Sequence, residues 1–400
     1  MISTIDIQSS DFYRDPYPFY EMLRREDPVH HVTQLDVWLV TRYDLVAEVF
    51  SDYRRFGKAW PEGVAPYNGP RPAEFAALDD IPADMLDSDP PDHTRLRRLV
   101  SKAFTPKAVE QQRDRILALV DRLIDAMLDK GEFDLVEDFA VPIPVRIISH
   151  ILGVPETDYV QFQNWTVDFV RSFDVTQSAE VKNRGMAAHL KLLNYFDELV
   201  AERRGRGGDD LISRLLEVED QGDTLSHGDL LAMCVLMLFG GYETTFSLIS
   251  NGTRLMLGHP EQRDLMRTGP HLARAACEEL VRYESPVQRI GYIAQHDMSF
   301  GGAEIPKGGV VLACIGAANR DPAIFSDPNV LDITRANNKQ IAFGRGVHYC
   351  IGAPLAILEA SIAIPRALER MPDLHIVDTE LDWAATSAHR RLQSLTARSR

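Results

Sequence analysis

Residues 343–352, FGRGVHYCIG, decide the fold of this chain. Gly344 and Gly346 allow a loop to turn tightly and let its backbone approach a flat object closely. A helical pattern begins directly after this loop, with Pro354 in its first turn. Cys350 would therefore lie just ahead of a helix N-terminus, where unpaired N–H groups and the positive end of the helix dipole favour the thiolate. The loop is predicted to bind a soft metal from one side through this sulfur.

The composition is that of an ordinary water-soluble globular protein. The chain has 400 residues, of which 45% are hydrophobic and 26% charged, and its formal net charge is −16. Such an acidic chain has no general attraction to nucleic acid or to an anionic membrane. The longest apolar run, Leu230 to Phe239, falls short of the ~18 residues that a membrane span needs. The N-terminus has no signal-peptide pattern, so we expect a cytoplasmic protein.

The other three cysteines have a simpler interpretation than Cys350. No two of the four cysteines have CxxC spacing, so the sequence indicates neither a zinc site nor a disulfide framework. We therefore expect Cys234, Cys277 and Cys314 to be small buried hydrophobic residues.

Most of the sequence is predicted to be helical and to form one domain, residues 1–400. Apolar side chains recur at steps of three to four residues. This pattern covers residues 107–130, 142–152, 187–204, 209–219, 227–257, 271–284 and 353–371. Strand-like segments are few: Asp36–Val40, and Met298–Cys314 with a turn at Gly301 and Gly302. The proline-rich segment 60–91 and the segment 168–182 are predicted to be irregular.

The sequence resembles the cytochrome P450 superfamily of haem-thiolate monooxygenases. The family's haem-loop pattern is F-G-x-G-x-H-x-C-x-G, and residues 343–352 match all six specified positions. The resemblance implies a mainly α fold with a minor β region: a triangular, prism-shaped helical domain plus a small β-rich lobe. It also implies a haem b cofactor with Cys350 as the axial ligand of the iron. A thiolate ligand of this kind favours O–O cleavage.

Residues 240–245, GGYETT, lie within the predicted helix 227–257. Taken alone, Gly240 and Gly241 could simply permit close helix packing, with Thr244 bonding back to its own helix. Alternatively, the Thr244 hydroxyl captures the carbonyl of Gly240 and opens a groove able to hold dioxygen and a water. The segment is similar to the family pattern [AG]-G-x-[DE]-T-[TS]. That resemblance assigns Thr244 to hydrogen bonding with oxygen at the iron and Glu243 to proton delivery.

Glu279 and Arg282 lie three residues apart on one face of a predicted helix. On spacing alone, an ordinary surface ion pair is the simpler interpretation. The two residues also match the family's E-x-x-R motif. The resemblance implies that they form a structural triad with Arg335, which holds the segment carrying the thiolate loop.

The resemblance further implies contacts to the haem and its propionates. The pair His93 and Arg97 matches a family H-x-x-x-R pattern, although an ordinary solvated helix face is the alternative. One position departs from the family, which usually has an arginine where this chain has Tyr292; either Tyr292 or Arg289 could take its place. The predicted haem contacts are His93, Arg97, Arg289, Tyr292, Phe343, Gly344, His348 and Gly352.

The resemblance predicts a small apolar or aromatic substrate and separate electron-transfer partners. Electrons would come from NAD(P)H through a ferredoxin and its reductase, and the protein is expected to be a monomer. The predicted substrate pocket comprises Phe169, Phe173, Met237, Gly240, Gly241 and Ile290. A cationic docking patch would comprise Arg95, Arg98, Lys102 and Arg345, unless these are merely solvated charges.

Three functions are compatible with these residues. The leading one is a monooxygenase that inserts one oxygen atom from O₂ by hydroxylation or O-dealkylation. A peroxide-driven haem-thiolate peroxygenase is the first alternative, but such variants typically lose the acid–threonine pair that Glu243 and Thr244 form. A non-catalytic haem sensor is the second alternative, and no DNA-binding or signalling module supports it. A requirement for NAD(P)H through ferredoxin and its reductase would separate the three.

Overall fold

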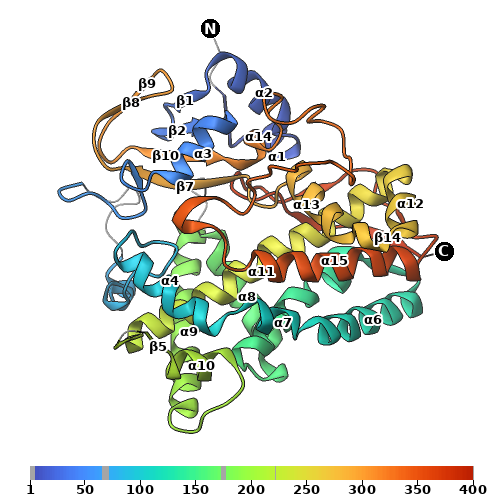
Figure 1. Ribbon diagram of the computed structural model, residues 1–400, viewed down its shortest axis with the longest axis horizontal. Helices are drawn as coiled ribbons and strands as arrows, with labels where there is room; N and C mark the ends of the chain where they lie inside the picture. The colour runs from blue at the N-terminus through green and yellow to red at the C-terminus, as the bar shows by residue number, and fades with distance from the viewer. Residues whose placement is uncertain (1–4, 65–71, 173–176, 221, 400) are drawn as a thin grey trace. The chain divides into compact units, whose positions relative to one another are not determined.

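The computed structural model describes residues 5–64, 72–172, 177–220 and 222–399 (Figure 1). The chain divides into two compact units. Unit 1 comprises Met1–Val64, Arg113–Ile143 and Thr244–Arg400, and unit 2 comprises Ala65–Gln112 and Pro144–Glu243. Helices account for most of the regular structure among the described residues, so the predicted mainly α fold with a minor β region is confirmed.

Unit 1 contains a five-stranded sheet. Its strands are, in spatial order, β1 (Val29–Val32), β2 (Val37–Val40), β10 (Val310–Cys314), β7 (Arg289–Ala294) and β3 (Phe56–Gly57). β10 runs parallel to β2, and the other pairs are antiparallel. The central strands β2 and β10 are buried along their whole length, which explains their continuous apolar sequences.

Strand β7 directs alternate side chains into two different core clusters, because successive side chains of a strand point to opposite faces. Tyr292 belongs to the cluster that contains Phe50 of helix α3 (Tyr43–Ser51). Ile293 belongs to the cluster that contains Phe12. Strand β7 is not predicted from the sequence, since Gly291 interrupts its apolar residues.

Unit 1 also contains helices. They are α1 (Ser10–Arg14), α2 (Tyr17–Glu26), α3, α6 (Arg113–Lys130), α12 (Pro260–Thr268), α13 (Ala273–Tyr283), α14 (Ile315–Ala318) and α15 (Ala353–Arg370). Helix α15 packs against both α6 and α13. Asp121 of α6 accepts hydrogen bonds at 2.8 Å from Arg366 and from Arg370 of α15. These contacts fix α15, whose first residue follows the loop that carries Cys350.

Smaller sheets and turns complete unit 1. One sheet contains β11 (His375–Ile376), β14 (Thr396–Arg398) and β4 (Glu132–Asp134), and a second pairs β12 (Asp382–Trp383) with β13 (Leu392–Ser394). β8 (Met298–Phe300) and β9 (Ala303–Ile305) form the predicted hairpin, in which Gly301 and Gly302 have positive φ of 57° and 92°. Short helical turns are η2 (Leu135–Ala140), η4 (Pro270–Leu272) and η5 (Gly346–His348).

Unit 2 is helical. Its elements are η1 (Ala73–Asp80), α4 (Asp92–Ala103), α5 (Pro106–Glu110), η3 (Glu156–Asp158), α8 (Tyr159–Arg171), α9 (Ala179–Arg203), α10 (Leu211–Glu217) and the hairpin of β5 (Glu219–Asp220) with β6 (Asp223–Thr224). Helix α7 (Pro142–Leu152) begins in unit 1 and continues into unit 2. Helices α8 and α9 pack along each other, with the Phe162 ring 4.5 Å from that of Tyr195.

The prediction that residues 168–182 are irregular is wrong at both ends of this segment. Helix α8 continues to Arg171, and α9 already begins at Ala179. Burial of Phe169 and Val170 extends the apolar face of α8, while the side chain of Ser178 caps the N-terminus of α9. The polar composition of these residues therefore gave no sign that they include the C-terminal end of α8 and the N-terminal end of α9. Phe173 lies outside the described residues.

Helix α11 (His227–Gly258) passes from unit 2 into unit 1 as one α-helix of 32 residues (Figure 1). Within the described part of the chain, it is the one helix long and apolar enough to cross a membrane. The share of its most apolar 18-residue window that is buried within the protein is 78%. That burial is typical of a helix in a protein core.

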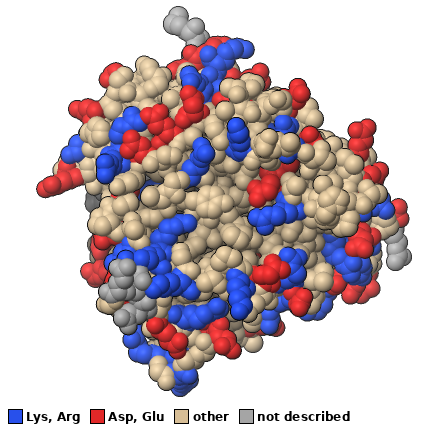
Figure 2. All heavy atoms as spheres, in the orientation of Figure 1, with Lys and Arg blue, Asp and Glu red and all other residues tan. Residues whose placement is uncertain are grey.

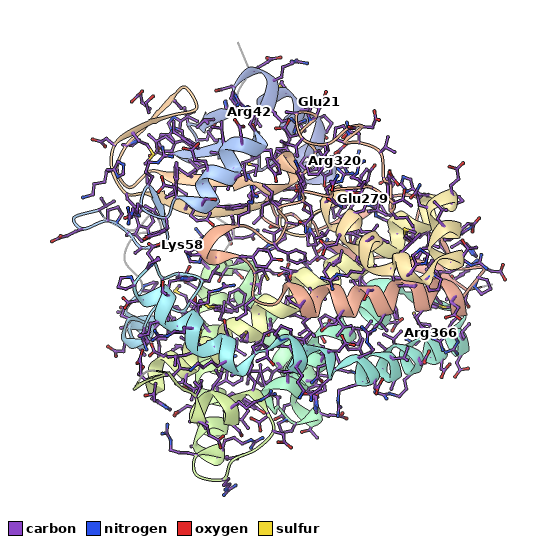
Figure 3. All side chains as sticks on the ribbon, in the orientation of Figure 1. Glu21, Arg42, Lys58, Glu279, Arg320 and Arg366 are labelled. Carbon is purple, nitrogen blue, oxygen red and sulfur yellow. The ribbon has the colours of Figure 1, made fainter. Side chains whose placement is uncertain are left out.

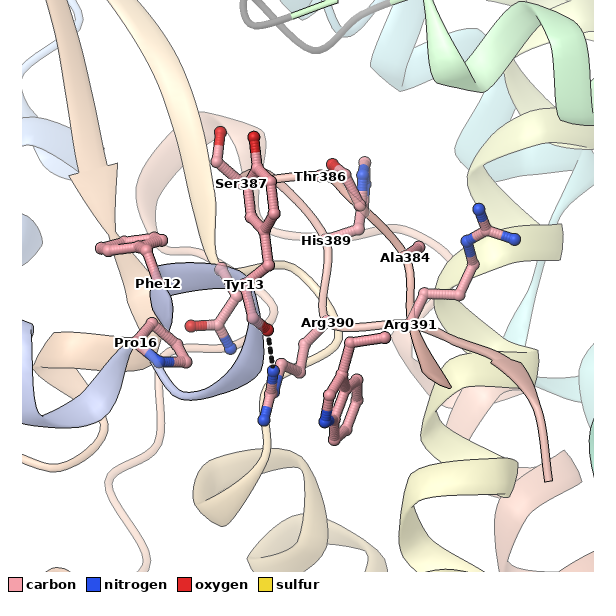
Figure 4. A pocket seen from close by; sticks show the side chains of 11 residues that line it. Phe12, Tyr13, Pro16, Ala384, Thr386, Ser387, His389, Arg390 and Arg391 are labelled. Atoms are coloured by element: carbon pink, nitrogen blue, oxygen red, sulfur yellow. Dashed lines mark hydrogen bonds between the residues drawn. The ribbon is translucent and has the colours of Figure 1, made fainter. Parts of the chain in front are cut away.

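The end of α13 is held by a buried ionic cluster around Glu284. This carboxylate accepts hydrogen bonds from Arg390 Nε at 2.9 Å, Arg254 Nη2 at 3.0 Å and the Tyr17 hydroxyl at 2.9 Å. Arg390 also donates to the carbonyl of Tyr13, beside a cavity of about 10 Å³ (Figure 4). The cluster therefore anchors the turn that leads from α13 into β7.

The cluster predicts a specific acid sensitivity. Burial opposes ionisation of Glu284, but Arg390, Arg254 and Arg320 outweigh it and lower its pKa to about 2. A depressed pKa stabilises the folded state above the unfolded pKa near 4.5, and this contribution is lost as the pH falls toward 2. Replacing Glu284 with glutamine should lower the free energy of unfolding at pH 7 by on the order of 3 kcal/mol.

Urea unfolding measured from pH 7 to pH 2 checks this prediction. The Glu284→Gln variant should lose less stability than wild type over that range, because its side chain cannot be protonated. Glu380→Gln, a change of the same chemistry at an exposed position, should behave as wild type. Parallel pH profiles for wild type and Glu284→Gln would contradict the predicted role of the carboxylate.

Candidate active site

The loop of residues 343–352 folds tightly against helix α3 in unit 1. Gly344 and Gly346 have φ of 70° and 67°, in the left-handed region that favours glycine. A Cβ atom at Gly346 would lie 2.6 Å from the carbonyl oxygen of Phe50, so no larger residue fits there. The backbone N–H of Cys350 donates to the carbonyl of Phe343 at 2.9 Å and closes the loop.

Cys350 is exposed, whereas the other three cysteines are buried. Burial raises the pKa of Cys314 to about 12 and raises the pKa of Cys234 and Cys277 still further. Cys350 lies three residues ahead of Ala353, the first residue of α15, so its sulfur is close to the positive end of a helix dipole. A Cβ at Gly352 would be only 3.8 Å from that sulfur.

This donor set fits a haem. An exposed sulfur at a helix N-terminus can ligate an iron from one side. The glycines of this loop have no side chains to keep a flat group away from the backbone. Phe343, Gly344, His348 and Gly352 are all half-buried around Cys350 in the same loop.

Helix α11 carries Glu243 and Thr244, which are predicted to deliver protons and to hydrogen-bond oxygen, and it continues through them without a break. A Cβ at Gly241 would pack at 3.6 Å from Ile148, whereas one at Gly240 would meet no described atom within 4 Å. The described residues therefore leave the space beside Gly240 open. Glu243 is only 6% exposed, and Thr244 follows it directly as a half-buried residue. The structure keeps α-helical geometry across the whole GGYETT segment.

The predicted triad is brought together in unit 1 (Figure 3 labels Glu279). Arg282 is fully buried and donates to both carboxylate oxygens of Glu279, at 2.7 and 2.8 Å. Arg335 Nε donates to the same carboxylate at 3.1 Å. Arg282 also donates to the carbonyls of Asn319, Pro328 and Val330.

Two further partners of this carboxylate are not predicted from the sequence. Asn338 Nδ2 donates to Glu279 Oε2 at 3.1 Å. The backbone N–H of Asp332 donates to Oε1 at 3.0 Å. Because Asn338 lies in a loop with no periodic pattern, its sequence neighbours give no sign of this contact.

The structure places His93 and Arg97 on helix α4 of unit 2, one turn apart. His93 is 1% exposed, and Arg97 is half-buried. Burial lowers the pKa of His93, and the neighbouring Arg97 lowers it further. A buried imidazole beside an arginine is an arrangement suited to receive an anion.

Tyr292 and Arg289 lie on opposite faces of β7, so the structure does not bring these two predicted haem contacts together. The Tyr292 ring is 5.9 Å from the Phe50 ring, on the side of α3. Arg289 Nε donates to the carbonyl of Ser387 at 2.8 Å, and its guanidinium lies 5.5 Å from the Phe12 ring. Only Tyr292 therefore shares a face with the helix against which the thiolate loop packs.

The predicted substrate-contacting residues differ in their surroundings. Phe169 is buried between rings of its own unit, 4.5 Å from His189 and 5.4 Å from Phe239. Met237 is buried within α11, and Ile290 of β7 is half-buried. Phe169 thus has a packing role within unit 2 that an aromatic side chain commonly has.

Part of the predicted docking patch is neutralised within unit 2. On the face drawn in Figure 2, Lys and Arg side chains gather at the lower left, where Figure 1 labels α4. Arg95 Nη2 donates to Asp229 Oδ2 at 2.8 Å, and Arg98 lies 3.8 Å from Asp223. Lys102 and, in unit 1, Arg345 are exposed.

Comparisons with known proteins agree with this geometry. The model of the family "Cytochrome P450" matches residues 30–372. The chain is 41% identical to "Cytochrome P450 monooxygenase PikC" of Streptomyces venezuelae, over 98% of this chain and 92% of that protein. It is 39% identical to "Vitamin D(3) 25-hydroxylase" of Pseudonocardia autotrophica, over 92% of this chain and 89% of that protein.

A solved structure is similar over nearly its whole length. This is P450BioI in complex with an acyl carrier protein that carries hexadec-9Z-enoic acid, with a TM-score of 0.88 and 36% identity. The alignment covers 98% of this chain and 100% of that one. The predicted cytochrome P450 fold is thereby confirmed. The chain belongs to the cytochrome P450 family, and it is a monooxygenase that binds haem b.

Proposed function

We propose that this P450 inserts one oxygen atom from O₂ into a C–H bond of a small apolar or aromatic substrate, by hydroxylation or O-dealkylation. The observation that carries the proposal is a buried carboxylate, Glu243, directly before Thr244 on the unbroken helix α11. One turn before Thr244 on the same helix, a Cβ at Gly240 would meet no described atom within 4 Å, which supports room for a small molecule there.

The haem, when bound, supplies the activation of O₂, and Cys350 tunes it as the iron's thiolate ligand. The chain's own residues supply protons. In the proposed relay, the carboxyl group of Glu243 passes a proton to Thr244 Oγ1, which donates it onward. Burial of Glu243 limits the number of waters near the relay, so Glu243 would take each proton from solvent and deliver it without flooding the site.

Replacing Thr244 with alanine tests the relay. The variant should bind haem and accept electrons as wild type does, because a methyl group fits the same position of the helix. Product formed per NAD(P)H should fall to roughly one-tenth or less, with hydrogen peroxide rising in its place, since the proton donor is gone. Product, peroxide and NAD(P)H consumption measured together check this.

Thr245→Ala is the matched control. Thr245 is the next residue of the same helix and is 3% exposed, so it reports any general effect of removing a buried hydroxyl. Its product yield should stay at the wild-type level. An undiminished yield in Thr244→Ala would contradict the proposed relay. Product formation with hydrogen peroxide alone, and none with NAD(P)H, would favour the peroxygenase alternative.

We propose a ferredoxin, served by an NAD(P)H-dependent reductase, as the electron donor. The exposed positions of Lys102 and Arg345 support docking of an acidic partner. Aspartates lie near Arg95 and Arg98 and partly neutralise their charges. Electron transfer should slow as salt rises from 0.05 to about 0.5 M, because the Debye length shrinks. A rate that does not depend on salt would argue against the patch.

An apolar substrate is supported by the relatives. P450BioI was solved in complex with an acyl carrier protein that carries hexadec-9Z-enoic acid, and another relative is named a vitamin D(3) hydroxylase. Both of these molecules are largely hydrocarbon. Titration of the ferric protein with a ligand library, followed by its absorption spectrum, tests the size and class of the substrate. We further propose that the protein is a cytoplasmic monomer of one domain, which sedimentation and cell fractionation would check.

We propose that His93, Arg97 and His348 hold the haem propionates. The support is the buried position of His93 beside Arg97 and the place of His348 in the thiolate loop. In this proposal the triad of Glu279, Arg282 and Arg335 has a structural role and does not contact the substrate.

A further inference from the structure

A lysine that the sequence motifs do not include lies over Tyr292, where the family usually has a propionate-binding arginine. Lys58 follows strand β3, which pairs antiparallel with β7 and places Gly57 opposite Ile293. Lys58 Nζ donates to the carbonyl of Gly291 at 2.7 Å. The same nitrogen is 3.8 Å from the centre of the Tyr292 ring. Figure 3 labels Lys58.

The position of Tyr292 shows on which side of the sheet the Lys58 ammonium lies. The Tyr292 ring contacts Phe50, and the carbonyl of Phe50 is the atom against which Gly346 of the thiolate loop packs. Tyr292 and the thiolate loop therefore both border helix α3 within unit 1, and Lys58 lies against the Tyr292 ring. Arg289 is held on the other face by Ser387 and Phe12.

We propose that Lys58 provides the cation for a haem propionate in place of the family's arginine, and that Tyr292 positions it. An ammonium group has three N–H donors, so it can bond the Gly291 carbonyl and a carboxylate oxygen together. The aromatic face attracts the ammonium and limits the rotamers of its long side chain. This preorganisation compensates for the flexibility that distinguishes lysine from arginine.

Lys58 is half-buried, whereas Gly291, whose carbonyl accepts its hydrogen bond, is exposed. A fully exposed ion pair contributes little because water screens it. Where the Tyr292 ring covers one side of the ammonium, a charge-assisted hydrogen bond is stronger. The inference concerns how haem is retained, and it is independent of the proposed substrate and electron donor.

The first test measures haem transfer from the ferric holoprotein to excess apomyoglobin. Replacing Lys58 with methionine should speed haem loss roughly tenfold, since one charge-assisted hydrogen bond is removed. Lys58→Arg should stay within about twofold of wild type, because the cation is kept. Lys307→Met is the matched control: Lys307 is also in unit 1 and donates to a backbone carbonyl, that of Glu62, at 2.9 Å.

The second test measures the haem reduction potential without substrate or partner proteins. Lys58→Met should lower the potential, because a nearby cation favours the added electron. Lys58→Arg and Lys307→Met should not change it. In the Lys58→Met background, Tyr292→Arg should restore slow haem loss by returning a cation to the family's position.

Two results would overturn the proposal. One is haem loss from Lys58→Met at the rate of Lys307→Met, with an unchanged potential. The other is equally fast haem loss from Lys58→Met and Lys58→Arg, which would make the shape of the side chain, and not its charge, the cause. Both measurements use holoprotein in the resting state, so neither depends on monooxygenase turnover.

Discussion

Replacing Cys350 with serine is expected to abolish the red-shifted absorption of the reduced CO complex. That band requires a thiolate on the iron, and a serine hydroxyl is neither ionised at neutral pH nor a soft donor. The loop itself should keep its fold, since the positive φ values and the Phe343–Cys350 hydrogen bond involve the backbone. Spectra of the dithionite-reduced protein under CO check the prediction.

Cys277→Ala is the control for the loss of a thiol. Cys277 is fully buried in α13, and its substitution should reduce stability slightly while leaving the red-shifted band in place. A Cys350→Ser protein that still shows this band would assign the iron ligand to another residue. Monooxygenase activity should fall by at least ~10³-fold together with the loss of this band, because the iron no longer has its thiolate ligand.

Removing the charge of Glu279 should have the second large effect. Arg282 is fully buried, so Glu279→Gln would leave an uncompensated cation inside unit 1. Breaking such a pair from one side costs about 3–5 kcal/mol. Because the same carboxylate also holds Arg335, Asn338 and the Asp332 backbone, the segment leading to the thiolate loop should loosen.

The measurements are the yield of haem-bound protein and the urea midpoint of unfolding. Glu278→Gln is the matched control, because Glu278 is the preceding residue of α13, is half-buried, and accepts one hydrogen bond, from Gln340 at 2.7 Å. It should change stability by less than about 1 kcal/mol. A Glu279→Gln midpoint equal to that of the control would refute the structural role of the triad.

Local sequence predicted those parts of the site whose geometry is local. The turn around Gly344 and Gly346 follows from two glycines within three residues, and the helix after Cys350 follows from its apolar spacing. The contact between Glu279 and Arg282 spans a single helical turn. Arg335 was placed by family resemblance, since spacing alone cannot predict a contact across 56 residues.

The residues that sequence did not predict depend on long-range pairing. Lys58 meets β7 only because β3 and β7 are neighbours in the sheet, and its hydrogen bond spans 233 residues. Asn338 reaches Glu279 across 59 residues from an irregular loop. The sequence of β7 has too little apolar alternation to predict a strand, so its two faces, and the separation of Tyr292 from Arg289, became visible only in the fold.

The contrast among the four cysteines has a practical consequence. Three thiols are enclosed and stay protonated, while the fourth lies at the surface beside a helix end. An alkylating reagent applied to native protein would thus mark a single position, and an iron on that sulfur would shield it. Label incorporation could then count the molecules in a preparation that lack their prosthetic group.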